Sequence, residues 1–189
     1  MSITAVLLAG GDSRRMGRDK ATLSLRDRPL WQTQLDLLRG LAPAEILVSA
    51  RIDPPWRPGD CRFVADDAPS HGPLSGLTAA LAQMRTTHLL ALAVDMPFMA
   101  PSYLRSLLDR IEPDCGVIPV IKNRAEPLAA IYPAQAQADF RAALCGEDFS
   151  LQRLVANLIT AGALRPIKVS ESEEELFQNL NRPGDLPVR

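Results

Sequence analysis

Short runs of apolar residues alternate along this chain with longer stretches of helical periodicity. The apolar runs cover residues 3–9, 45–50, 61–65, 88–94, 115–120 and 127–132. The first and fourth runs are almost continuously apolar, which is typical of central strands that are covered on both faces. We therefore predict a strand over each of the six runs.

The stretches between the runs place apolar residues every three or four positions, which predicts amphipathic helices. Two such faces are formed by Trp31, Leu35, Leu38 and Ala42 and by Leu74, Leu77, Leu81 and Met84. Further helices are predicted over residues 101–111, 133–144 and 150–159. Strands that alternate with helices of this length indicate an α/β fold, a single three-layer α/β/α domain with a mostly parallel central sheet.

The composition of the chain narrows the classes of protein to which it can belong. The chain has 189 residues and a formal net charge of -1, so we expect one domain with no general attraction to nucleic acid or to an anionic membrane. Its three cysteines form no Cys-x-x-Cys pair, which argues against a zinc site or a disulfide framework. No apolar run approaches ~18 residues and no signal peptide is recognisable, so we expect a cytoplasmic protein.

A glycine-rich stretch, LLAGGDSRRMGRDK, follows directly from the first strand. Gly10 and Gly11 let the backbone approach a ligand closely, and a cluster of cations follows them: Arg14, Arg15, Arg18 and Lys20. Ligands of open α/β sheets bind at the carboxyl ends of strands, so this stretch predicts a phosphate site. It matches neither the Walker pattern nor the dinucleotide fingerprint. A tight turn beside a solvated basic surface is the alternative interpretation.

Two further strand ends carry acids. Asp95 follows the strand over residues 88–94, and a carboxylate there suits Mg²⁺, which binds carboxylates together with phosphate oxygens. The alternative, a cap for the helix at residue 101, places Asp95 too far upstream. Asp66 and Asp67 follow the third strand, and either carboxylate can accept hydrogen bonds from the edge of a nucleotide base. Gly72 is predicted to start a helix whose free N–H groups favour anions, although an ordinary capped loop fits equally well.

The glycine-rich stretch, extended to LLAGGDSRRMGRDKATL, resembles the signature of molybdenum cofactor guanylyltransferases. These enzymes belong to the nucleotidyltransferases with a glycosyltransferase-A-like, Rossmann-like fold. The shared pattern is Leu-Ala-Gly-Gly, then Arg-Met-Gly, then Asp-Lys, at this spacing. The resemblance implies that a nucleotide is held by Leu8, Ala9, Gly10, Gly11, Arg15 and Lys20. Arg15 and Lys20 would contact the phosphates.

Other segments extend the resemblance over nearly the whole chain. Asp95-Met-Pro resembles the family's metal-binding Asp-x-Pro, and the segment from Asp66 to Leu77 resembles its Asp…Gly-Pro-Leu-x-Gly-Leu, whose aspartate contacts the nucleotide. The spacing to Gly72 favours Asp66 over Asp67. One position departs from the pattern, because Ser49 stands where some members have a nucleotide-binding asparagine. Its side chain is shorter but can still form a hydrogen bond, so Ser49 is kept as a nucleotide-binding residue.

The C-terminal FQNLNRPGDL resembles the segment that lines the family's pterin site, which implies that Asn179 and Asn181 bind the acceptor. Arg182 and Gly184 replace a threonine and an acid of the family pattern. The resemblance divides the domain into a nucleotide-binding half, residues 1–100, and an acceptor-binding half, residues 101–189.

The implied reaction transfers GMP from GTP to the terminal phosphate of molybdopterin and releases pyrophosphate. A phosphate monoester is largely dianionic at neutral pH, since its second pKa is about 6, so the attack needs no general base. Arg15, Lys20 and a Mg²⁺ ion on Asp95 would align the groups and neutralise charge. Transient contacts with proteins that deliver and receive the cofactor are also implied.

Three alternatives stay open. A CTP-dependent cytidylyltransferase usually has Ala-Ala-Gly where this chain has Ala9-Gly10-Gly11, and the extra glycine leaves room for a purine. Sugar-phosphate nucleotidyltransferases are usually longer. A non-catalytic nucleotide or cofactor carrier would not need both Lys20 and Asp95.

Overall fold

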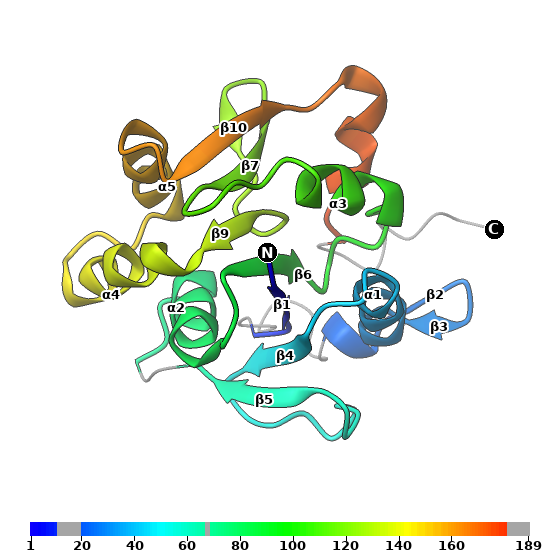
Figure 1. The fold of residues 1–189 in the computed structure, drawn as a ribbon. Coiled ribbons are helices and arrows are strands. Elements are labelled where there is room, and N and C mark those ends of the chain that lie inside the picture. Colours follow the sequence, from blue (N-terminus) through cyan, green and yellow to red (C-terminus); the bar gives the residue numbers. More distant parts are fainter. Residues whose placement is uncertain (11–19, 67–68, 181–189) are drawn as a thin grey trace.

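The computed structural model describes residues 1–10, 20–66 and 69–180, which form a sheet between two layers of helices (Figure 1). The sheet has the strand order β10-β7-β9-β6-β1-β4-β5, with β8 paired to β7. Its strands are β1 (Ile3–Leu8), β4 (Glu45–Ala50), β5 (Arg62–Ala65), β6 (His88–Ala93), β7 (Gly116–Ile121), β8 (Arg124–Ala125), β9 (Ile131–Pro133) and β10 (Leu164–Lys168). A separate hairpin pairs β2 (Ser24–Leu25) with β3 (Arg28–Pro29).

Strand β1 lies at the centre of the parallel part of the sheet. It pairs in parallel with β4 on one side and β6 on the other, and its last residue, Leu8, is in register with Ser49 and Ala93. Both β1 and β6 are buried nearly throughout, as their continuous apolar sequences predict. The carboxyl ends of these strands therefore meet at one edge of the sheet.

Alternate residues of the strands face the two helical layers. Ala5 and Leu7 of β1 pack against a layer formed by α1 (Leu30–Arg39), α3 (Pro101–Leu108) and the 3₁₀ helix η4 (Glu171–Phe177). Val6 and Leu8 pack against the layer formed by α2 (Pro73–Gln83), α4 (Gln137–Cys145) and α5 (Leu151–Thr160). This arrangement confirms the three-layer α/β/α fold. Within the described part of the chain, every helix is too short or too polar to span a membrane.

The region around Pro133 differs from the prediction. The strand expected over residues 127–132 is a turn followed by β9, and Tyr132 closes that turn by donating from its hydroxyl to the carbonyl of Pro127 at 2.7 Å. Pro133 ends β9 rather than starting a helix, because it pairs with His88 at the end of the ladder, where a residue without an N–H is tolerated. The next helix begins with the 3₁₀ turn η3 (Ala134–Ala136).

Two elements of the C-terminal part were not predicted. Strand β10 forms at one edge of the sheet, parallel to β7. The acidic run after Ser170 folds as η4. Ser170 and Glu173 form a capping box at its start, which satisfies two N–H groups of the first turn.

Candidate functional site

The carboxyl ends of β1 and β4 are joined by backbone hydrogen bonds. The amides of Ala9 and Gly10 both donate to the carbonyl of Ser49, at 2.9 and 3.1 Å, and the amide of Val94 donates to the carbonyl of Leu8 at 3.1 Å. After β1 the chain continues through β4 and β5 on one side, and it then crosses to β6 on the other side. Such a reversal of strand order is where open α/β sheets bind ligands. The site residues predicted at the carboxyl ends of β1, β4 and β6 therefore lie at the same edge of the sheet.

The side chain of Asp66 is closely surrounded at this edge by Ser49, Gly10 and Gly76, which form the Asp66 cage. Its Oδ1 accepts a hydrogen bond of 2.6 Å from the buried hydroxyl of Ser49, and its amide donates to Ala50. A Cβ added to Gly10 would lie 2.6 Å from Asp66 Oδ2, and one added to Gly76 would lie 2.6 Å from Ser49 Oγ. Only glycines leave room for this arrangement. The sequence prediction included Gly10 but missed Gly76, which the spacing Gly-Pro-Leu-x-Gly already contains.

The first turn of α2 borders the same cage. Gly72 has a positive φ of 66° and precedes Pro73, so α2 begins as the sequence predicted. Gly72, the N-cap residue, has no side chain that could cap the helix. One residue upstream, the amide of His71 donates to Ser75 Oγ at 2.9 Å, and the ring of His71 stacks on Phe149 with 3.6 Å between ring centroids. The stack joins the segment before α2 to the segment before α5.

Lys20 and Asp95 form an ion pair at the end of β6. The Nζ of Lys20 lies 3.1 Å from Oδ2 of Asp95, and the two side chains are 26% and 22% exposed. The amide of Leu180 donates to the backbone carbonyl of Asp95 at 2.9 Å, which brings the neighbouring, exposed Asn179 to this edge. The structure therefore brings together residues that the sequence assigned to the phosphates, the metal and the acceptor.

Gln34 also contacts this region, although the sequence analysis did not select it. Its side chain is fully buried, and its Nε2 donates to the carbonyl of Met96 at 2.6 Å. Met96 directly follows Asp95. The signal that could have found Gln34 is its spacing, because it lies midway between the buried residues Leu30 and Leu38 on α1.

The side chains at this edge fit a metal ion that takes its remaining ligands from a substrate. Within residues 1–10, 20–66 and 69–180, no three His, Cys, Asp or Glu side chains gather into a cluster that could hold a metal alone. Asp95 supplies one partly exposed carboxylate. Mg²⁺ is usually bound by one or two carboxylates together with phosphate oxygens and waters, so a single aspartate beside a triphosphate is sufficient.

Four of the predicted site residues lie outside the described residues. They are Gly11, Arg15, Asp67 and Asn181. Their expected contacts with nucleotide or acceptor stay predictions.

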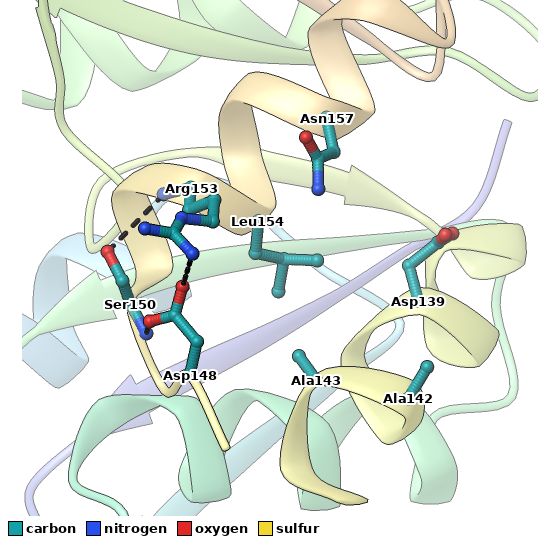
Figure 2. Close-up of a pocket in the computed structure, with 8 residues that line it drawn as sticks. All are labelled: Asp139, Ala142, Ala143, Asp148, Ser150, Arg153, Leu154 and Asn157. Atoms are coloured by element: carbon teal, nitrogen blue, oxygen red, sulfur yellow. Dashed lines mark hydrogen bonds and ion pairs between the residues drawn. The ribbon is translucent and has the colours of Figure 1, made fainter. Parts of the chain in front are cut away.

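The molecule has further hollows, of which two lie in the second half of the chain. One, of about 620 Å³, lies near the carboxyl ends of β7 and β10 between Lys122 and Lys168. Figure 2 shows the other, of about 290 Å³, between α4 and α5. Its rim is braced by an ion pair of 2.7 Å between Arg153 and Asp148. None of the predicted site residues lines either hollow.

Comparison with known proteins shows the family to which this chain belongs. Residues 5–165 match the family described as the MobA-like NTP transferase domain. The chain is 35% identical to a probable molybdenum cofactor guanylyltransferase of Opitutus terrae, over 97% of this chain and 93% of that protein. It is 31% identical to the molybdenum cofactor guanylyltransferase of Xanthomonas euvesicatoria, over 95% and 90% of the two chains.

A solved structure has the same fold. It is the molybdopterin-guanine dinucleotide biosynthesis protein A of Archaeoglobus fulgidus, which superposes with a TM-score of 0.76 at 23% identity and covers 97% of this chain and 94% of its own.

Proposed function

Because this chain belongs to the MobA-like NTP transferase family, we propose that it transfers GMP from GTP to the terminal phosphate of molybdopterin and releases pyrophosphate. The observation that carries the proposal is the 3.1 Å contact between Lys20 and Asp95. It sets a cation suited to phosphate beside a carboxylate suited to a metal ion, at the point where the strand order reverses. Relatives named for the same reaction cover more than nine-tenths of this chain.

The nucleotide would lie over the ends of β1 and β4. Close approach is possible at Gly10, which has no side chain between the backbone and the Asp66 cage. The positive end of the α2 dipole at Gly72 would favour a phosphate. Asp66 would accept from the guanine N1–H and N2–H₂ groups, and the hydrogen bond from Ser49 would fix its orientation. Leu8 and Ala9 supply the backbone that bounds this position.

Asp95 would hold a Mg²⁺ ion that arrives with the triphosphate. When bound, this ion supplies charge neutralisation at the phosphate oxygens. Lys20 exchanges its contact with Asp95 for the phosphates and stabilises the charge that develops on the leaving pyrophosphate. Arg15 would add a second cation.

The acceptor would approach from the side of η4. Asn179 is exposed and precedes Leu180, whose amide binds the carbonyl of Asp95. An acceptor on Asn179, and on Asn181, would therefore present its terminal phosphate close to the metal-binding carboxylate. One of its phosphate oxygens forms the new bond to the α-phosphorus, and the bond to the β-phosphate oxygen breaks. Since the attacking phosphate is already ionised, no residue needs to remove a proton.

Incubation of the purified chain with molybdopterin, MgCl₂ and each NTP in turn tests the proposal. We expect guanylylated product and pyrophosphate in equal amounts with GTP. Preference for CTP would replace the proposal with a cytidylyltransferase. Nucleotide binding without pyrophosphate release would indicate a carrier.

A further inference from the structure

Gln34 is a polar residue in an apolar environment. It lies on the buried face of α1 with Leu30, Leu35 and Leu38, and its side chain is fully buried. Its Oε1 has no hydrogen-bond partner among the described residues, and a buried acceptor without a donor is costly. A leucine or methionine would fill this position without that cost. The feature that distinguishes glutamine is its Nε2, which donates to Met96.

The turn at Met96 does not need the hydrogen bond from Gln34 to satisfy its backbone groups. The carbonyl of Met96 also accepts from the amide of Met99 at 3.2 Å, and the amide of Met96 donates to Ala93. Loss of the Gln34 amide would therefore leave this carbonyl with a donor. The bond instead adds a connection between two elements that the turn itself does not join, α1 and the end of β6.

This connection closes a ring of contacts around the Lys20–Asp95 pair. The carbonyl of Lys20 accepts from Leu23, and the carbonyl of Leu23 accepts from Leu30, the first residue of α1. One turn later Gln34 binds Met96, the neighbour of Asp95, and Asp95 binds the Nζ of Lys20. The main chain at Lys20 and the main chain at Asp95 are thus held at a fixed separation through α1.

We propose that Gln34 is a positioning residue for the reaction, which sets the place of Asp95 relative to Lys20 by holding the carbonyl of Met96 against α1. Gln34 acts through Met96 and not on the substrate. The inference rests on the proposed function, because it gives Asp95 its task of holding the metal. Residues that orient a metal ligand from behind typically change metal affinity by about 10–100-fold when they are replaced.

The variant Gln34→Met tests this role, since it keeps the length of the side chain and removes the amide. We expect the midpoint of the Mg²⁺ titration of turnover to rise about 10-fold or more. Calorimetry should show an equal loss in Mn²⁺ affinity in the presence of a non-hydrolysable GTP analogue. The melting temperature should stay within a few degrees of that of the wild type.

Tyr132→Phe is the matched control. It also removes a buried side-chain donor to a backbone carbonyl, that of Pro127, in the turn before β9, and it leaves the bond between Gln34 and Met96 in place. We expect its metal affinity to be unchanged. Gln34→Leu, which removes the amide with a different shape, should reproduce the effect of Gln34→Met.

Two outcomes would overturn the inference. One is an unchanged Mn²⁺ affinity in folded Gln34→Met and Gln34→Leu. The other is that both variants unfold below the assay temperature, which would make Gln34 a residue of the core. Asp95→Asn separates this inference from the function itself: if that variant loses metal binding while both Gln34 variants keep it, the metal assignment stands and the positioning role fails.

Discussion

Lys20 Nζ lies 3.1 Å from Asp95 Oδ2, so the side chain suited to phosphate contacts the side chain suited to metal. Each of the two groups therefore neutralises the charge of the other. A metal–triphosphate complex carries both partners needed to replace this contact, a cation for Asp95 and an anion for Lys20. Breaking the contact between Lys20 and Asp95 costs the least energy when the metal ion and the triphosphate bind at the same time.

Lys20→Ala should lower turnover by about 10²–10³-fold, the usual effect of removing one preorganised group that stabilises transition-state charge. The measurement is kcat with saturating GTP and molybdopterin, beside a thermal melt that shows an intact fold. Arg28→Ala is a suitable control, because Arg28 is an exposed cation paired with Asp36 on the surface. Wild-type turnover in Lys20→Ala would remove Lys20 from the mechanism.

Asp95→Asn should weaken activity and its Mg²⁺ dependence together, because an amide is a poorer ligand for a hard cation than a carboxylate. A Mg²⁺ titration of initial rates measures the effect. Asp60→Asn serves as the control, since Asp60 is an exposed acid paired with Arg39. If the Mg²⁺ midpoint of Asp95→Asn equals that of the wild type, the metal is held elsewhere.

Gly76→Ala should raise the KM for GTP. A helical glycine replaced by alanine ordinarily gains up to about 1 kcal/mol of stability. Here the new Cβ would lie 2.6 Å from Ser49 Oγ, so the hydroxyl must rotate away from Asp66. A hydrogen bond to a charged group contributes about 1.5–3 kcal/mol, which predicts a change in KM of about tenfold or more.

Steady-state kinetics with varied GTP would measure this, and Ser49→Ala should show a similar change because it removes the same hydroxyl. Gly59→Ala is the control, since nothing lies within 4 Å of a Cβ added at Gly59. Unchanged kinetics in both Gly76→Ala and Ser49→Ala would exclude Asp66 from the recognition of guanine.

Glu126→Gln should stabilise the fold at neutral pH. Burial raises the pKa of the Glu126 carboxyl, and the charge of Arg124 opposes this only in part. The folded state therefore holds its proton to higher pH than the unfolded state, so stability falls as pH rises from the unfolded pKa through the folded one. In urea unfolding at pH 4, 5.5 and 7, the stability of Glu126→Gln relative to the wild type should therefore increase as the pH rises. Parallel pH profiles would contradict the prediction.

The sequence predicted those elements whose environment is uniform along their length. Strands β1 and β6 are buried on both faces, so an unbroken apolar run identifies them. Strand β10 is different, because every residue after Leu164 is partly or fully exposed and Pro166 interrupts it. Such an edge strand resembles a loop in its sequence, and only pairing with β7 defines it.

Site residues are also predictable only where their place follows from the strands themselves. Residues at strand ends, such as Asp66 and Asp95, follow from the positions of the strands. Gln34 does not, because its role depends on which turn packs against α1, and a polar residue on a helix is ordinarily expected to face solvent. Gly76 depends equally on a contact between α2 and the end of β4. The roles of Gln34 and Gly76 depend on contacts between segments that are far apart in the sequence. The spacing of apolar residues does not predict such contacts.

The place of β9 between β6 and β7 has a consequence for synthesis on the ribosome. The strands β1, β4, β5 and β6 all lie within the first half of the chain and can pair as it emerges. Strand β6, buried at every residue in the finished fold, then has an open hydrogen-bonding edge until Ile131–Pro133 has been made. An apolar strand edge of this kind readily pairs with other chains, so the nascent protein is most prone to aggregate during the interval before β9 arrives.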